Sequence, residues 1–218
     1  MILGISTSLS QFSVTLYNNG VIYCNQIQRG IEGPSICEFI SHALEHVKID
    51  IRDITNIVVD IGPGGTISVR TGVSYANGLS YSLDIPIIGI SSAELIGISA
   101  YKMYSQPVAV LFKSVKSNYY CGLYNDGNIE FKYSDIRGIS KYINEEFASI
   151  VLAGNEAAIT NLENHLIGVN IERTNIQKVD PYILCEYSPM FISKAKKYPF
   201  LPTPINEANL IEWSQDLK

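Results

Sequence analysis

Four consecutive residues, Gly62-Pro63-Gly64-Gly65, lie where a short apolar strand expected over 57–61 gives way to a helix. Glycines at such a junction allow a tight turn and leave backbone N–H groups at the positively polarised start of the helix, a place that suits an anion. A plain strand-to-helix turn with close packing explains the same residues without a ligand. The loop is therefore a candidate anion or nucleotide site whose meaning depends on its surroundings.

Hydroxyl groups, and few acids, follow the strands that would hold a metal-bound nucleotide. Ser6–Ser8 follow the first expected strand, and Lys113 and Ser114 follow the first strand of the second half. A divalent ion needs anionic oxygen ligands, and neither position has an acid. Asp60 is the one acid at a strand end near the loop. It could orient Gly62–Gly65 or bind a solvent ion, but a single carboxylate cannot build a nucleotide or two-metal site. We expect no ATP hydrolysis by this chain alone and neither metal nor cofactor bound to it.

Two histidines have the spacing of a metal pair. His42 and His46 form a His-x-x-x-His motif, in which both imidazoles can reach one ion. On the expected helix they lie roughly opposite the apolar stripe, and His165, the remaining histidine, is in the distant second half. A solvated helix face explains the pair better, so we predict no metal site.

Composition restricts the function classes further. The chain has 218 residues, of which 46% are hydrophobic and 17% charged, which is too apolar for a disordered protein. A formal net charge of −5 argues against direct binding of nucleic acid. The four cysteines are widely spaced and form no Cys-x-x-Cys motif, a pattern that fits a protein of a reducing compartment. With no signal peptide and no apolar run as long as a membrane span, we expect a cytoplasmic protein that contacts no membrane.

The elements that position these residues occur twice in the same order. In the first half, apolar patterns predict strands over 2–6, 12–17, 21–27, 57–61 and 86–90 and helices over 36–47, 69–83 and 92–103. Capping boxes, Ser-x-x-Glu, precede the first and third helices, at 35–38 and 91–94. The second half predicts strands over 108–112, 119–124, 129–133, 150–153 and 169–171 and helices over 139–147, 156–166 and 188–198.

Both halves therefore read β-β-β-α-β-α, although a three-strand meander followed by βα units could produce this order by coincidence. The halves share no obvious sequence identity, and the Pro-rich stretch 181–204 has no clear pattern. We expect an α/β protein with two domains, 1–105 carrying the Gly-Pro-Gly-Gly loop and 106–218.

The region around the loop resembles the TsaB family, also called YeaZ. The matching residues are Ile57–Gly72, Ala76-Asn77-Gly78-Leu79 and Asp84–Ser92. Members of that family carry Gly-Pro-Gly-Ser-Phe-Thr-Gly-Leu-Arg-Ile-Gly, then Ala-x-Gly-Leu-Ala, then Ile-Pro-Val-x-Gly-Val-Ser-Ser/Thr. The opening Ile2–Thr7 resembles their first strand, which usually ends in Asp-Thr. The resemblance covers residues 1–105 and is thin beyond.

This resemblance implies both a fold and a role. The fold would be the two-lobed actin/Hsp70/sugar-kinase type, a duplicated ribonuclease-H-like unit. The role would be in making N6-threonylcarbamoyladenosine beside the anticodon of tRNA, with tRNA contacted only indirectly. In that family TsaB is a non-catalytic partner, its paralogue TsaD transfers the threonylcarbamoyl group, and TsaE is an ATPase of the same complex. ATP and Mg would then be used by the partners.

Several residues depart from the family pattern. Ser6 stands where the family usually has an acid, Gly65–Ser68 replace Ser-Phe-Thr-Gly, and 113–115 replace Asp-Ala-Arg. A closing Pro-x-Tyr-Leu-Arg is not evident in 209–218.

The last feature of the sequence is a candidate interface with a partner protein. Gly72, Ala76 and Ser80 recur every four residues along the helix after the loop, and such a ridge of small residues lets another helix, or the chain's own sheet, approach closely. The resemblance implies docking to TsaD through the first two helices in a four-helix bundle. Carried over, the contact residues are Ile36, Cys37, Ile40, Ala43, Leu44, Arg70, Val73, Ala76 and Asn77.

Three functions remain open at this stage. The first is a TsaB-like, catalytically silent subunit, which could also pair with itself as a homodimer. The second is a diverged, self-pairing interaction module without a role in tRNA modification. The third is a small-molecule kinase or ATPase of the same fold that uses Gly62–Gly65 as a phosphate cradle.

Overall fold

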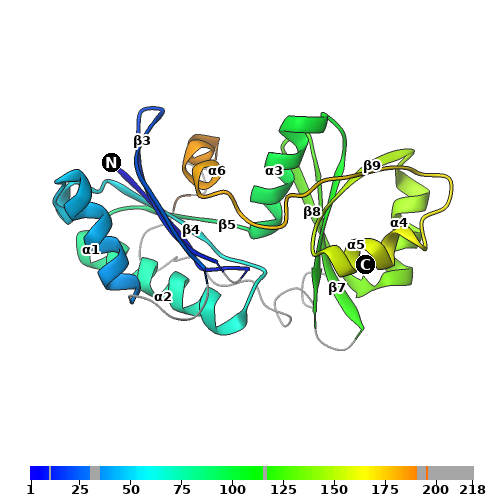
Figure 1. The fold of residues 1–218 in the computed structure, drawn as a ribbon, viewed down its shortest axis with the longest axis horizontal. Helices are drawn as coiled ribbons and strands as arrows, with labels where there is room; N and C mark the ends of the chain where they lie inside the picture. The colour runs from blue at the N-terminus through cyan, green and yellow to red at the C-terminus, as the bar shows by residue number, and fades with distance from the viewer. Residues whose placement is uncertain (10, 30–34, 115–116, 191–194, 196–218) are drawn as a thin grey trace. The chain divides into compact units, whose positions relative to one another are not determined.

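The computed structural model describes residues 1–9, 11–29, 35–114, 117–190 and 195, and not the side chains of 11 and 24–29. The chain forms two compact units. The first contains Met1–Ser92 and the segment that begins at Val179, and the second contains Ala93–Lys178. Each unit is a five-stranded sheet covered by helices (Figure 1).

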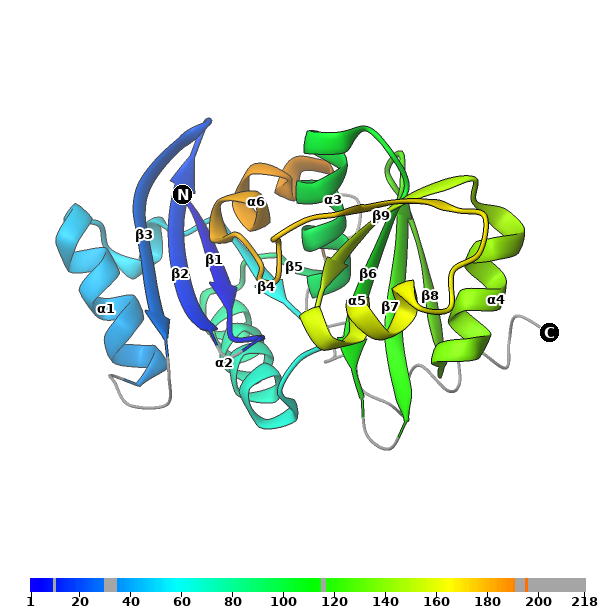
Figure 2. The ribbon, with the colours of Figure 1, turned by 45° about the vertical axis from the view of Figure 1, so that its right-hand side comes forward.

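The first unit has the sheet order β3-β2-β1-β4-β5, in which β1 is antiparallel to β2 and parallel to β4. Figure 2 shows β3, β2 and β1 side by side. Its strands are β1 (Ile2–Ser6), β2 (Gln11–Asn18), β3 (Val21–Arg29), β4 (Asn56–Asp60) and β5 (Ile87–Ile90). Its helices are α1 (Ile36–Val47), the 3-10 turn η1 (Ile51–Asp53), α2 (Thr66–Leu83) and α6 (Pro181–Glu186).

The second unit repeats this topology, with the sheet order β10-β9-β6-β7-β8. Its strands are β6 (Val108–Lys113), β7 (Asn118–Asn125), β8 (Asn128–Asp135), β9 (Ser149–Gly154) and β10 (Asn170–Arg173). Its helices are α3 (Ser92–Tyr104), α4 (Ile136–Glu146) and α5 (Glu156–Glu163). The duplicated β-β-β-α-β-α order predicted from the sequence is confirmed.

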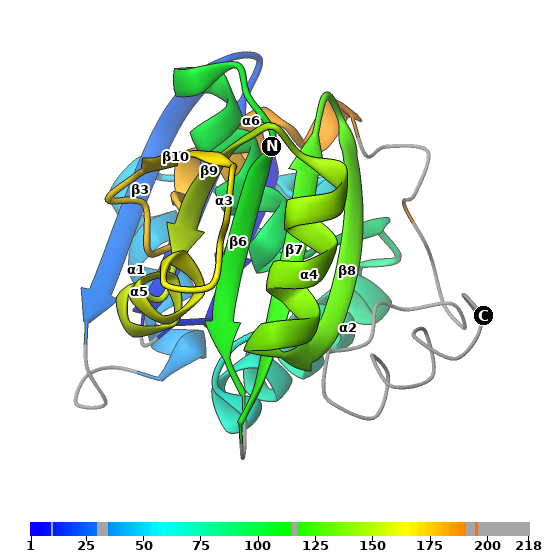
Figure 3. The same ribbon diagram turned by 90° about the vertical axis from the view of Figure 1, so that its right-hand side faces the viewer.

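Each sheet carries two helices on one face and one on the other. In the first unit α1 and α2 pack on Leu3 and Ile5 of β1, and α6 lies on the opposite face (Figure 1). A Cβ atom at Gly4 would lie 2.5 Å from Cys185 Sγ of α6, so this glycine lets α6 approach the sheet. In the second unit α4 and α5 cover one face (Figure 3), and Ala93 of α3 packs against Gly122 on the other.

Helix starts were predicted best where a Ser-x-x-Glu capping box precedes them, at α1 and α3. At α1 the Glu38 backbone N–H donates to Ser35 Oγ (3.3 Å) and the Ser35 N–H donates to Glu38 Oε2 (2.7 Å), as the capping box predicts. Helices α2 and α4 each begin three residues before the predicted start. The Asp135 carboxylate caps α4 by accepting from Gly138 N (2.8 Å).

The short helix α6 lies in the stretch for which the sequence showed no pattern, and the helix predicted over 188–198 falls mostly outside the described residues. Within the described part of the chain, no helix is long and apolar enough to cross a membrane.

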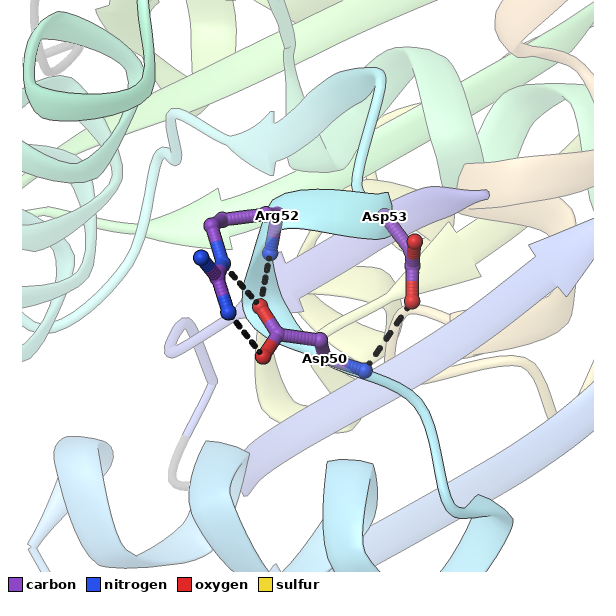
Figure 4. A network of polar contacts seen from close by, with 3 residues as sticks. All are labelled: Asp50, Arg52 and Asp53. Atoms are coloured by element: carbon purple, nitrogen blue, oxygen red, sulfur yellow. Dashed lines mark hydrogen bonds and ion pairs between the residues drawn. The ribbon is translucent and has the colours of Figure 1, made fainter.

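A surface network of hydrogen bonds fixes the turn that leads into β4 (Figure 4). Asp50 accepts from the backbone N–H (2.9 Å) and Nε (2.8 Å) of Arg52, while Asp53 accepts from Asp50 N (3.1 Å). These bonds hold the pKa of the Asp50 carboxyl well below its ordinary value. Because the side chains are exposed, the ion pair contributes little to stability, and its role is to shape the turn.

Candidate functional site

A fully buried carboxylate lies at the carboxyl edge of the first sheet, beside the Gly-Pro-Gly-Gly loop. Asp60, the last residue of β4, is 0% exposed. One of its oxygens accepts from Ser6 Oγ (2.8 Å) and from Ser8 Oγ, and the other accepts from Ser92 Oγ (2.6 Å) and the Gly62 backbone N–H (2.9 Å). Both oxygens are thus hydrogen-bonded by the chain itself.

The groups that contact Asp60 are all uncharged. Burial raises the pKa of this carboxyl above its ordinary value, and the hydrogen bonds from Ser8, Ser92, Gly62 and Ser6 oppose that shift in part. A cation at this carboxylate would have to displace its donors. In the part of the chain that the structure describes, no group of three or more His, Cys, Asp or Glu residues could hold a metal ion.

The loop that follows Asp60 is packed tightly against the end of β1. A Cβ atom at Gly64 would lie 2.9 Å from Ser8 Cβ, and Thr7 Oγ1 donates to Ser68 O (2.7 Å) at the start of α2. Gly62 has a φ of +90°, a conformation that favours glycine. Gly62 and Pro63 are buried, whereas Gly64 and Gly65 are exposed.

Gly65 is the N-cap of α2, and no side chain caps that helix start. Anion binding at the loop stays a prediction, and its exposed half, Gly64–Gly65, is the part that a ligand could reach.

Most of the predicted contact residues lie in the core of their own unit. Five of them are at most 8% exposed, namely Ile40, Ala43, Leu44, Val73 and Ala76. They pack in the cluster between the sheet and helices α1 and α2. The small-residue ridge at Gly72, Ala76 and Ser80 likewise packs inward, because all three residues are buried. These side chains can contact a partner only if the core opens.

The other four predicted contact residues reach the surface. Cys37 and Arg70 are exposed, and Ile36 and Asn77 are half-buried. Burial, and then a hydrogen bond with the Cys37 thiol, raise the pKa of Tyr75 on α2 to about 12, so the surface of α1 adjoins that of α2 here. We call Ile36, Cys37, Arg70 and Asn77 the outer residues of α1 and α2.

The remaining candidates do not converge on a site. His42 and His46 are both exposed on α1, as expected for a solvated face. In the second unit His165 Nδ1 lies 2.9 Å from Asn161 O, Lys113 is exposed, and Ser114 Oγ is 3.4 Å from the Tyr133 hydroxyl.

Sequence reasoning identified Asp60 and the hydroxyls at the end of β1 but missed Ser92. The parallel pairing of β4 with β5 brings Ser92 to Asp60 across 32 residues. A serine at or just after the end of each strand that flanks β4, Ser6 in β1 and Ser92 after β5, is the signal that could have revealed this cluster.

Comparison with known proteins identifies relatives of both sequence and fold. The family model for TsaD, tRNA N6-adenosine threonylcarbamoyltransferase, matches residues 34–178. The tRNA threonylcarbamoyladenosine biosynthesis protein TsaB of Buchnera aphidicola subsp. Schizaphis graminum is 32% identical over 107 residues, 49% of this chain and 51% of that protein. Its namesake from Buchnera aphidicola subsp. Acyrthosiphon pisum is 25% identical over 84% of this chain and 88% of its own length. The matched region thus spans about half of the first relative and most of the second.

Among solved structures, YeaZ from Pseudomonas aeruginosa superposes with a TM-score of 0.75 at 15% identity, over 94% of this chain and 98% of its own. A ROK family protein from Streptococcus pneumoniae has a TM-score of 0.50 at 10% identity, over 88% and 98%. At these identities the structures show the fold alone. They confirm the two-lobed, actin-like α/β fold class predicted from the sequence.

Proposed function

This chain belongs to the TsaD and TsaB (YeaZ) family, and from that membership we propose that it is a TsaB-like subunit without catalytic activity of its own. It would support a TsaD-like enzyme that transfers a threonylcarbamoyl group to the adenosine beside the tRNA anticodon. The observation that carries the proposal is the similarity to TsaB over 84% of the chain.

The chemistry of the site is compatible with a silent subunit. The acid beside the Gly-Pro-Gly-Gly loop is saturated by four donors from its own chain. ATP and Mg would be used by the TsaD-like enzyme and a TsaE-like ATPase, and tRNA would be contacted only through the complex. A formal net charge of −5 supports that indirect role, and we place the complex in the cytoplasm.

The outer residues of α1 and α2 are the proposed contact with the TsaD-like enzyme. An arginine among partly apolar neighbours is a common composition for the energetic centre of an interface. The five core residues nearby act indirectly, since they hold the two helices in place on the sheet.

The first test is a binding titration between this chain and the TsaD-like enzyme of the same organism. Arg70→Glu is expected to weaken the complex by about tenfold or more, because it places a carboxylate in the proposed contact. Arg137→Glu reverses an equally exposed arginine on α4 of the second unit and is the matched control. Wild-type chain that fails to bind, or an unchanged affinity for Arg70→Glu, would contradict the subunit role or the contact, respectively.

The same samples distinguish the other functions. A homodimer that persists when the TsaD-like enzyme is present in excess would favour the self-pairing module. Mg-dependent binding of ATP to the purified chain, measured by calorimetry, would favour a kinase or ATPase. The subunit proposal expects heterodimer formation, stimulation of threonylcarbamoyl transfer and no turnover of ATP by this chain alone.

A further inference from the structure

Asp60 connects four segments of the first unit at one point. Its carboxylate accepts hydrogen bonds from the end of β1, from the loop after β1, from the Gly-Pro-Gly-Gly loop and from the segment after β5, through Ser6, Ser8, Gly62 and Ser92. Each donor is a neutral group at the same edge of the sheet. A buried acceptor with four donors fixes the relative positions of the segments that supply them.

Positions 6 and 60 are neighbours on adjacent strands. Strand β1 runs parallel to β4, with Ile5 opposite Val59, so Ser6 and Asp60 follow at the same edge of the sheet. The Ser6 hydroxyl is 2.8 Å from the Asp60 carboxylate, and both side chains are at most 1% exposed. A carboxylate placed on β1 at position 6 would therefore enter the same small volume.

We propose that Asp60 is the positioning residue of the Gly-Pro-Gly-Gly loop. The carboxylate that does this can be supplied either by position 60 on β4 or by position 6 on β1, and the fold requires one such carboxylate and only one. The serine at position 6 fits this role, because β4 supplies the carboxylate and Ser6 donates to it. This assignment concerns the loop itself and does not depend on the partner proposed above.

Both unbalanced combinations are unfavourable for identifiable reasons. Two carboxylates at positions 6 and 60 would repel each other in a buried site whose hydrogen-bond donors are neutral groups. With no carboxylate, the hydroxyl donors and Gly62 N lose their acceptor while they stay buried. Gly64 packs on Ser8, and Thr7 donates to Ser68 O, so a displaced β1 end would also displace the start of α2.

A double-mutant cycle tests the exchange. We compare wild type, Ser6→Asp, Asp60→Ser and the double variant Ser6→Asp/Asp60→Ser by thermal unfolding. Each single variant is expected to lower the melting temperature by about 5–10 °C. The double variant is expected to recover more than half of the summed loss, because it again holds one carboxylate among hydroxyl donors.

Ser13→Asp/Asp60→Ser is the matched control. Ser13 pairs with Ser6 in the sheet and is equally buried, but it lies on β2, two strands from β4. At about 4.8 Å per strand its carboxylate cannot replace that of Asp60, so this variant should recover nothing.

Hydrogen exchange gives a local readout. The Gly62 amide should exchange about tenfold faster in Asp60→Ser than in wild type, while amides of β7 in the second unit stay unchanged. A double variant no more stable than the weaker single variant, or unfolded, would overturn the exchange of roles, as would rescue by the Ser13 control. An unchanged exchange rate at Gly62 in Asp60→Ser would overturn the positioning role.

Discussion

Strands β4 and β9 end in different ways, although each lies between the central strand and the parallel edge strand of its sheet. β4 ends at Asp60, whose side chain collects hydrogen bonds from neighbouring segments. β9 ends at Gly154, whose backbone N–H donates to Ile176 O (3.0 Å). Both units make a main-chain hydrogen bond at this edge, from Ile61 N to Ile90 O (3.0 Å) in the first, and the first unit adds a buried acid to it. A common topology fixes where this junction lies, while the chemistry that closes it is free to differ.

The helices that follow these strands differ as well. Asn155 caps α5 by accepting from Ala158 N (3.0 Å), whereas α2 begins at Gly65 without a side-chain cap. The first unit thus leaves the start of α2 exposed and without a side-chain cap. The second unit closes its helix start with a neutral amide.

The largest expected effect on stability is at Gly154, where a main-chain hydrogen bond joins the end of β9 to Ile176. Gly154 has a φ of +101°, and a Cβ atom there would lie 3.0 Å from Leu111 N and closer still to Leu111 O. Gly154→Ala should therefore cost about 3 kcal/mol in the free energy of unfolding, measured by urea denaturation. Gly168→Ala is the control, since Gly168 also has a positive φ but no atom within 4 Å. Its cost should be about 1 kcal/mol. Equal losses would show that backbone conformation, and not packing on Leu111, closes this edge.

The next largest effect should be a pH dependence of the free energy of unfolding that arises from Asp60, the buried acid at the end of β4. Burial raises the folded-state pKa of Asp60, so between the unfolded and folded pKa values the unfolded chain has lost a proton that the folded chain keeps. The stability contributed by this group is therefore greatest at low pH and falls as pH rises through that window. Asp60→Asn should remove this fall, as measured by the urea midpoint at several pH values.

Asp126→Asn, in the exposed turn between β7 and β8, should keep the wild-type profile. If Asp60→Asn and wild type have parallel profiles, the carboxyl does not titrate differently in the folded chain.

The smallest effect concerns the uncapped helix. Gly65→Ser offers a hydroxyl to the first free N–H groups of α2, and a Cβ atom there would meet only Ser68, at 3.6 Å or more. It should stabilise the first unit by a few tenths of a kcal/mol, detectable as a small rise in melting temperature. Asn155→Gly, the reverse change at α5, should lower stability by a similar amount. A loss of stability in Gly65→Ser would indicate that the loop needs glycine at this position.

The sequence was most informative where a local rule decides the structure. The box at Ser35 and Glu38 marks the start of α1, and alternation and turn residues mark the hairpins. The start of α2 was predicted too late because Thr66, Ile67 and Ser68 are exposed, so the apolar period begins only at Val69. α6 is six residues long, which is too short for a helical period to be recognised.

The site was less predictable from the sequence because it depends on which face of each helix packs against the sheet. Ala76 and Leu44 are apolar or small, and the same pattern suits packing on the chain's own sheet and docking to a partner. The position of the sheet in the folded chain distinguishes these two possibilities, and it places both residues in the core. Ser92 could not be connected to Asp60 without the register between β4 and β5.

The return of α6 to the first sheet has a consequence for synthesis on the ribosome. Residues Ala93–Lys178 of the second unit are translated after β5 and before α6. At about 5–20 residues per second, several seconds pass before α6 is available to cover the face of the first sheet that contains Gly4. The packing of α6 on this sheet, and with it the folding of the first unit, can therefore be completed only after the second unit has been synthesised.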